Sequence, residues 1–312
     1  MNWIEPKRLA SGMTIGIMAP ASASDEDLHK IEEICASKGY KVLWGDSVHR
    51  KGLYGGTPEE QATEFQYMMT AAPCDAVLAL RGGYGTMRYL EQLDYNAIRK
   101  YRKAFIGYSD CTALHMAINR YSQLITYHGP MGVDFKPERK ADIDALFNTV
   151  EGKLQVIEPL PEPPRGAIGT DLGDGVLRGG NMTMLSMLLG TPYFLEDESW
   201  EDTLLFIEDV GEAPYKLDRM LQQFRLSGLL SRIKGLVLGT FTNCEGDEEE
   251  VDYDLGYEAL RYMEENRNSE LPEPFVCYVP TGHGSPHQTL PLGATISFRY
   301  ISNTIIVHPY TK

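Results

Sequence analysis

Residues 102–120 read RKAFIGYSDCTALHMAINR: a short apolar run, the corner GYSD, and then apolar residues at helical spacing. The pattern predicts a buried strand that turns sharply into a helix, with Ser109 at the turn. A serine at such a corner has two interpretations. Either Ser109 or Asp110 caps the helix, or the turn projects the Ser109 hydroxyl into a cleft beside exposed backbone N–H groups. The corner alone leaves both open.

Strand-like and helical segments alternate through the first half of the chain. The strand-like runs lie at 14–21, 40–45, 74–80 and 103–107, and the helical patterns between them at 25–39, 57–72 and 86–94. Such alternation predicts parallel βαβ units with helices on both faces of the sheet. Ligands of such sheets bind beyond the carboxyl ends of the strands. Both RGGYG (81–85) and GYSD (107–110) lie at such ends.

The glycine-rich turn LRGGYGTMR (80–88) differs from a dinucleotide-binding fingerprint. It lacks the GxGxxG spacing after the first strand, and no acidic residue follows at the expected distance. Its backbone amides are instead suited to stabilising an oxyanion at a strand end.

The chain changes character in its second half. Residues 136–170 pass from a weak helical pattern into the proline-rich stretch 159–164, which we interpret as a linker. We therefore expect an N-terminal domain at 1–135, a linker at 136–170 and a C-terminal domain at 171–312.

Composition restricts the function classes. The 312 residues carry a net charge of −15 with a pI near 4.9, which disfavours a nucleic-acid partner. The start of the chain lacks the pattern of a signal peptide, and no apolar run is long enough to span a bilayer. The five cysteines are scattered without a CxxC pair, so neither disulfides nor a zinc site is indicated. We expect a cytoplasmic protein with no membrane partner.

A nucleophilic serine needs a base and usually an acidic residue to orient that base. His128, in YHGPMG, follows a strand-like run and could line a site. His283 and His287 lie in a glycine-flanked loop, PTGHGSPHQTLPLG, that follows an apolar strand, and either is also compatible with a plain loop histidine. For the carboxylate, the stretch LLFIEDVGEAPY offers Glu208, Asp209 and Glu212. The same three residues fit an N-terminal cap cluster for the next helix, and spacing alone does not separate the two roles.

Several motifs together resemble those of the LD-carboxypeptidases, a family that also contains the microcin C-resistance peptidases. They occur in the family's order and cover nearly the whole chain. The motifs are RGGYG (81–85), GYSD (107–110), RGGN (178–181), IEDVGEAPYKLDRML (207–221), PTGH (280–283) and LPLG (290–293).

The resemblance implies a serine peptidase whose triad comprises Ser109 as nucleophile, His283 as general base and Glu208 as orienting carboxylate. It implies an oxyanion hole made by the amide of Gly83 (or Gly82) and that of Asp110, with no metal and no cofactor. The implied fold is α/β, with a parallel N-terminal nucleophile domain and a partly barrel-like C-terminal domain. Basic residues in or beside the motifs are candidates for binding substrate carboxylates; they are Arg81, Arg88, Arg178, Lys216 and Arg219.

The implied activity is release of terminal D-alanine from cytoplasmic murein tetrapeptides during cell-wall recycling, by a homodimer. One alternative is hydrolysis of peptidyl or aminoacyl adenylates, as in the microcin-resistance branch. Another, of a different class, is a catalytically silent protein that binds wall peptides. Trp200 is the one indole between RGGN and IEDV, in the acidic run LEDESWED (195–202), which is a poor setting for a nucleotide. We therefore expect the peptide to be the preferred substrate.

Overall fold

The chain forms two compact units in the computed structural model, one made of Met1–Lys153 with Thr289–Gly293 and the other of Leu154–Gln288 with Ala294–Lys312. The described residues are 3–153, 155–157, 174–194, 200–246, 254–265, 275–297, 300–301 and 304–307.

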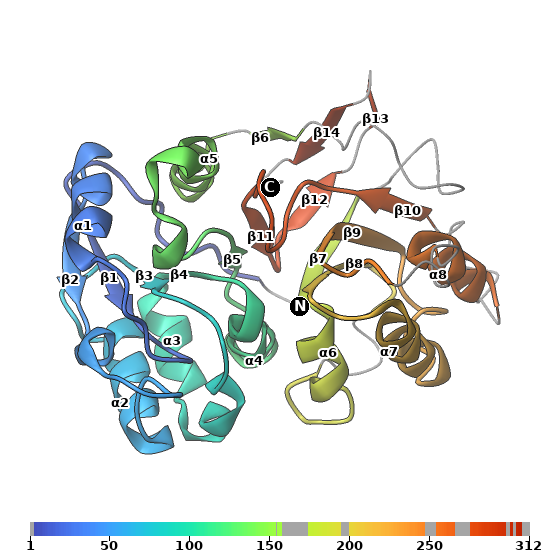
Figure 1. Ribbon diagram of the computed structural model, residues 1–312, viewed down its shortest axis with the longest axis horizontal. Coiled ribbons are helices and arrows are strands. Elements are labelled where there is room, and N and C mark those ends of the chain that lie inside the picture. Colours follow the sequence, from blue (N-terminus) through green and yellow to red (C-terminus); the bar gives the residue numbers. More distant parts are fainter. Residues whose placement is uncertain are drawn as a thin grey trace. The chain divides into compact units, whose positions relative to one another are not determined.

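A six-stranded sheet forms the centre of the first unit, in the order β11-β5-β4-β3-β1-β2 (Figure 1). Its first five strands along the chain are parallel, as the alternating pattern predicts. They are β1 (Thr14–Met18), β2 (Lys41–Trp44), β3 (Ala76–Ala79), β4 (Ala104–Gly107) and β5 (Thr126–His128). The sixth, β11 (Leu290–Leu292), comes from the far end of the chain and pairs antiparallel with β5.

Helices cover both faces of this sheet (Figure 1). One face carries α1 (Leu28–Ser37) and α5 (Lys140–Val150), which share a hydrophobic core with β1, β3 and β4. The other carries α2 (Pro58–Met69), α3 (Tyr95–Tyr101) and α4 (Thr112–Ser122), which pack against one another. Local sequence sets where helices begin: α2 starts with a capping box, in which Thr57 and Glu60 satisfy each other's backbone N–H groups.

The first unit extends past the predicted boundary at residue 135. Helix α5 lies inside the predicted linker, and its Ile143, Leu146 and Phe147 are buried in the core of the first unit. Because spacings of three and four residues place these side chains on one helix face, the helix buries that face in the core and belongs to the first unit. The proline-rich stretch 159–164 lies outside the described residues.

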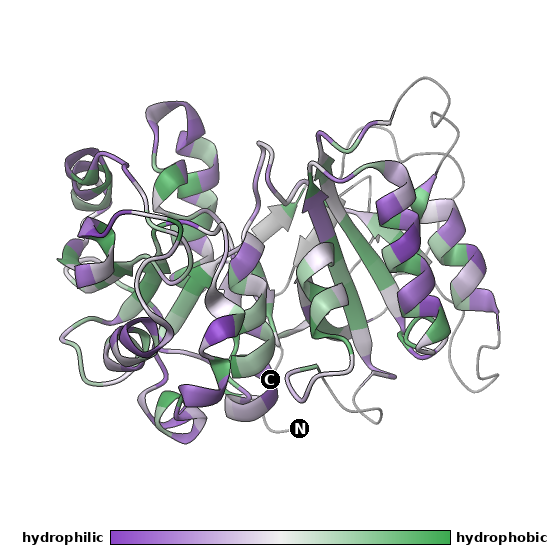
Figure 2. Cartoon of the chain, turned by 60° about the horizontal axis from the view of Figure 1, so that its bottom comes forward, coloured by the Kyte–Doolittle hydropathy of each residue, from purple (hydrophilic) through white to green (hydrophobic). Residues whose placement is uncertain are grey.

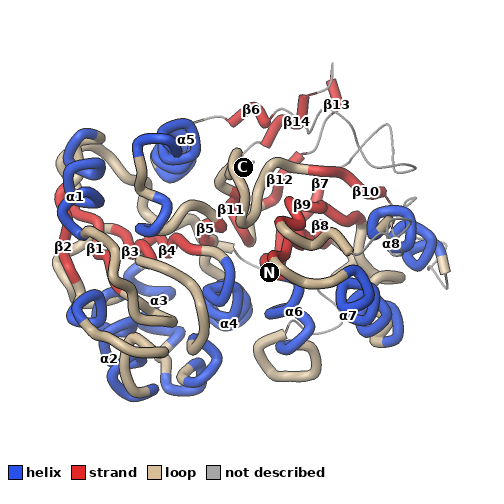
Figure 3. The backbone as a smooth tube through the Cα atoms, in the orientation of Figure 1, coloured by secondary structure: helices blue, strands red, loops and turns tan. Residues whose placement is uncertain are grey.

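The second unit contains a five-stranded sheet in the order β10-β9-β8-β7-β12 (Figure 3). Four strands are parallel: β7 (Asp174–Asn181), β8 (Thr203–Val210), β9 (Gly235–Thr242) and β10 (Phe275–Tyr278). The edge strand β12 (Thr295–Ser297) is antiparallel to β7. A small antiparallel sheet joins β13 (Tyr300–Ile301), β14 (Thr304–Val307) and β6 (Gln155–Ile157).

The described residues of the second unit also form helices α6 (Met182–Leu188), α7 (Pro214–Leu226) and α8 (Leu255–Glu264). Figure 2 shows strands that are mostly hydrophobic and helices with hydrophilic outer sides. In α7, for example, Leu217, Leu221 and Phe224 are buried. The fold is therefore α/β, with the parallel N-terminal sheet and the curled, partly barrel-like C-terminal sheet that the resemblance implied. Within the described ranges, no helix has the length and apolar character required to cross a membrane.

Candidate active site

Ser109 occupies a strained corner between β4 and α4. Its φ is +62°, in the left-handed region that non-glycine residues rarely adopt. Such a backbone costs on the order of 1–3 kcal/mol and is concentrated at functional sites. No side-chain bond caps the short 3₁₀ turn Ser109–Cys111 or α4 behind it. The capping interpretation of Ser109 is therefore wrong, and the corner has the geometry of a nucleophile elbow.

The glycine-rich loop after β3 lies against this corner. A Cβ atom at Gly82 would lie 2.9 Å from Ser109 Cβ and 3.1 Å from Ser109 Oγ, so only glycine permits this approach. Gly83 has a φ of +105°, and a Cβ there would lie 2.4 Å from the hydroxyl oxygen of Ser22. The structure thus brings together Ser109 and the loop whose amides the sequence predicted for the oxyanion hole.

Asp110 uses its side chain to hold this loop rather than to cap a helix. Its Oδ2 accepts the Thr86 N–H at 2.9 Å, and the Thr86 hydroxyl donates to the Asp110 carbonyl at 2.7 Å. Burial raises the pKa of the Asp110 carboxyl, and the bonds from Thr86 and Gly85 oppose that rise. The resemblance invoked only the Asp110 amide, and nothing in the sequence marked Thr86.

The two histidines nearest to this corner along the chain are buried. His115 Nε2 lies 2.8 Å from the Gly107 carbonyl oxygen, and the ring packs on Phe105. Burial lowers the pKa of His115 to about 3, so its imidazole is neutral. His128 is also fully buried, with its ring 5.8 Å from that of Tyr108. Their complete burial separates them, as candidate bases, from the partly exposed His283.

Glu208 and His283 form a hydrogen-bonded pair in the second unit. Glu208 Oε2 lies 2.7 Å from His283 Nδ1, and Glu208 is completely buried. Because an ionised carboxylate only accepts, Nδ1 carries the proton, and Nε2 is left as the basic nitrogen. This is the arrangement that a general base needs.

A bulge in β9 makes this pair possible. Ile207 faces Leu238 and Asp209 faces Phe241, so β9 has one extra residue opposite Glu208. A Cβ at Gly239 would lie 2.8 Å from Glu208 Cβ, so glycine lets the two strands approach there. The His283 loop is equally close: a Cβ at Gly282, whose φ is +148°, would lie 3.1 Å from Glu208 Oε2.

The three acidic residues at the end of β8 have different partners. Asp209 accepts from the Thr183 N–H and hydroxyl and from Asn181, so it holds the start of α6. Glu212 forms an ion pair with Lys216 in the first turn of α7, at 3.0 Å. The interpretation of these residues as a cap for the following helix is wrong, because α7 has no side-chain cap and Asp209 instead bonds the first turn of α6. Glu208 alone among the three contacts a histidine.

The basic candidates have different surroundings within their own units. Arg81 directly precedes Gly82 and donates to the Ala23 carbonyl at 3.3 Å. Arg178 is buried within 6.0 Å of the Trp200 ring, and burial lowers its pKa to about 10. Arg219 lies exposed on α7 with its guanidinium over the Tyr215 ring. Of the three, Arg81 is the one beside a predicted catalytic element.

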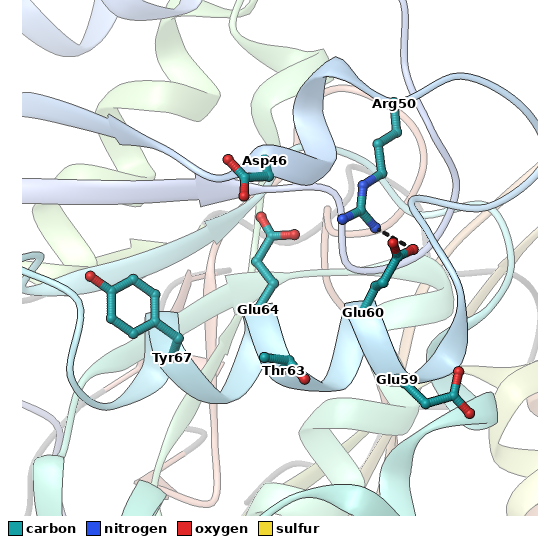
Figure 4. A pocket seen from close by; sticks show the side chains of 7 residues that line it. All are labelled: Asp46, Arg50, Glu59, Glu60, Thr63, Glu64 and Tyr67. Atoms are coloured by element: carbon teal, nitrogen blue, oxygen red, sulfur yellow. Dashed lines mark hydrogen bonds and ion pairs between the residues drawn. The ribbon is translucent and has the colours of Figure 1, made fainter.

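A pocket of about 410 Å³ lies in the first unit, at the end of β2 (Figure 4). Carboxylates dominate its lining, and Arg50 is paired there with Glu60 at 3.0 Å. It contains none of the residues predicted for catalysis. The described part of the chain contains no group of three or more His, Cys, Asp or Glu side chains that could hold a metal ion.

Comparison with known proteins identifies the family. The model of the LD-carboxypeptidase N-terminal domain matches residues 15–129, and that of the C-terminal domain matches residues 174–298. The chain belongs to the LD-carboxypeptidase family. It is 33% identical to a probable murein peptide carboxypeptidase of Bacillus subtilis, over 97% of this chain and 94% of the relative.

Two further relatives represent both branches named above. A crystal structure of a muramoyltetrapeptide carboxypeptidase from Oxalobacter formigenes is similar with a TM-score of 0.81 and 29% identity, covering 96% of this chain and all of that one. A microcin self-immunity protein of Escherichia coli is 25% identical over 96% of this chain and 94% of its own length.

Proposed function

We propose that this LD-carboxypeptidase family member is a serine peptidase that removes terminal D-alanine from murein tetrapeptides. The buried hydrogen bond between Glu208 and His283 carries the proposal, because it leaves His283 Nε2 basic. The strained corner at Ser109 supplies a nucleophile of the right type. Relatives that bear carboxypeptidase names support the choice of substrate.

In the proposed reaction these groups act in the order that the resemblance implies. His283 Nε2 takes the Ser109 proton as Oγ attacks the carbonyl carbon of the L,D bond. The amides of Asp110 and of Gly83 (or Gly82) stabilise the resulting oxyanion. The C–N bond then breaks, and His283 returns the proton to the amino group of the departing D-alanine. Water, deprotonated by His283, hydrolyses the acyl-enzyme in the same way.

We assign Arg81 as the residue that binds the carboxylate of the substrate's terminal D-alanine. It lies beside Gly82, whereas Arg178 is buried against Trp200 and Arg219 is exposed on α7. A fixed cation near the nucleophile suits the carboxylate of a terminal D-alanine. The cytoplasmic location and the homodimer remain predictions from the resemblance.

The adenylate alternative cannot use Trp200 as a platform for the base. Trp200 is 1% exposed and stacks on Phe194 with ring centroids 5.0 Å apart, so its face is already covered. A nucleobase needs an accessible aromatic face. The silent-binder alternative gives no role to the basic Nε2 that the Glu208–His283 hydrogen bond leaves on His283, because binding a peptide does not require a general base.

Release of D-alanine from a murein tetrapeptide, followed by mass analysis, tests the proposal. Ser109→Ala should reduce kcat by at least about three orders of magnitude, because triad members act as a unit. The matched control is Ser37→Ala, which removes an exposed hydroxyl at the end of α1. Turnover by Ser109→Ala near the wild-type rate would show that the serine mechanism is wrong.

A further inference from the structure

The proposed oxyanion hole takes its two amides from different loops. One loop follows β3 and contains Gly82 and Gly83, and the other follows β4 and contains Asp110. A Cβ atom at Gly82 would lie 3.5 Å from the Asp110 nitrogen, so the two loops run in contact. Catalysis by such amides depends on their placement to within tenths of an ångström. Something must therefore hold one loop against the other.

Asp110 and Thr86 join the two loops reciprocally. The Asp110 carboxylate accepts the Thr86 N–H at 2.9 Å, while the Thr86 hydroxyl donates to the Asp110 carbonyl at 2.7 Å. Thr86 is completely buried and Asp110 is 3% exposed. Water is thus kept from competing for these bonds, which makes them strong and directional.

Ser22, which follows β1, holds the opposite side of the glycine loop. Its hydroxyl accepts the Tyr84 N–H at 3.0 Å, and its N–H donates to the Gly82 carbonyl at 3.2 Å. The loop is therefore fixed at both ends. Ser22 sets its position on the sheet. The two Asp110–Thr86 bonds, together with a backbone hydrogen bond from Gly85 to the Asp110 carboxyl, tie it to the residue after the nucleophile.

We propose that Asp110 and Thr86 are positioning residues that set the separation of the two oxyanion-hole amides; this inference rests on the proposed function. The side chain of Asp110 thus has a role separate from that of its amide. We call the two Asp110–Thr86 bonds the clamp. Because the oxyanion forms only in the transition state, loss of the clamp lowers kcat and leaves KM nearly unchanged. If these bonds were merely structural, their loss would lower the stability of the protein and leave the kcat of the folded enzyme unaltered.

Two substitutions at Thr86 separate these roles. Thr86→Val keeps the shape of the side chain and removes its hydroxyl. We expect kcat for the tetrapeptide to fall about 10- to 100-fold, with KM within about twofold of the wild-type value. Loss of a whole oxyanion-hole donor lowers kcat by about 10²–10³-fold. Thr86→Ser restores the hydroxyl and should recover most of the rate. The control Thr149→Val removes a hydroxyl that donates to Ala145 within α5, at 2.7 Å. It should lower the melting temperature without lowering kcat.

A second readout does not depend on the natural substrate. Phosphonylation of Ser109 by a fluorophosphonate, followed by intact mass, should slow in Thr86→Val and recover in Thr86→Ser. Asp110→Asn, which retains one acceptor oxygen, should slow it as well, and this variant serves if Thr86→Val does not fold. Wild-type rates in folded Thr86→Val and Asp110→Asn would overturn the inference. If the wild-type protein reacts with the probe but releases no D-alanine, the proposed substrate fails while the clamp is still judged by this assay.

Discussion

Replacing Glu208 by glutamine tests the site most sharply. The side chain is completely buried, and its Oε2 lies 2.7 Å from His283 Nδ1. Glutamine has the same shape but no negative charge, so packing around β8 and the bulge of β9 should survive. What disappears is the charge that stabilises the imidazolium formed when His283 takes the Ser109 proton.

The geometry sets the size of the effect. Two opposite unit charges about 4 Å apart attract each other by about 4 kcal/mol at an effective dielectric constant of about 20. Each 1.36 kcal/mol in the activation barrier changes the rate about tenfold. We therefore expect kcat of Glu208→Gln to fall by about three orders of magnitude. KM should change little, because the imidazolium is absent from the ground-state complex.

The assay measures kcat and KM for D-alanine release, together with the melting temperature of each variant. Glu212→Gln is the matched control, because it removes a carboxylate four residues away that pairs only with Lys216 in the described contacts. It should retain close to the wild-type kcat. If folded Glu208→Gln kept more than about a tenth of the wild-type kcat, Glu208 would not be the residue that orients the base.

The remaining predictions concern substrate choice, metal dependence and the effect of pH. The ratio kcat/KM should be far higher for a murein tetrapeptide than for an aminoacyl sulfamoyl adenylate, and a preference for the adenylate would reverse the choice of branch. Chelators should leave activity unchanged, and loss of activity on chelation with recovery on adding zinc would contradict this. Activity should rise with pH as His283 loses its proton. Because burial raises the folded-state pKa of Asp110, the folded protein holds a proton that the unfolded chain releases, so stability falls as pH rises from the unfolded value through the folded one. Asp110→Asn should therefore lose this pH dependence in thermal unfolding, and an unchanged profile would mean that Asp110 does not cause it.

Local sequence patterns predicted the elements that position the nucleophile. The parallel strands β1 to β4 are short apolar runs bounded by turn residues, and the corner at Ser109 is indicated by the four consecutive residues GYSD. These features are decided by neighbours along the chain. They can therefore be predicted without knowing what packs against them.

Features that depend on distant contacts were not predicted. Strand β11 comes from residues near the end of the chain, yet it pairs with β5 in the first unit. Helix α5 was interpreted as part of a linker because its pattern is weak, and burial in the core decides its place. Thr86 carried no signal at all, because its importance lies in two bonds to a residue 24 positions away.

The choice among Glu208, Asp209 and Glu212 shows why spacing alone was insufficient. All three follow one apolar strand, and their roles are separated by an extra residue in a neighbouring strand, opposite Glu208. Gly239 and Gly282 have no side chains, and only that lets β9 and the His283 loop come close to this carboxylate. The candidate site therefore depends on several features that lower the stability of the fold: a left-handed backbone at Ser109, a bulge in β9, and buried carboxylates at Glu208 and Asp110. Each is unfavourable for folding alone, and each fixes a group that the proposed reaction requires.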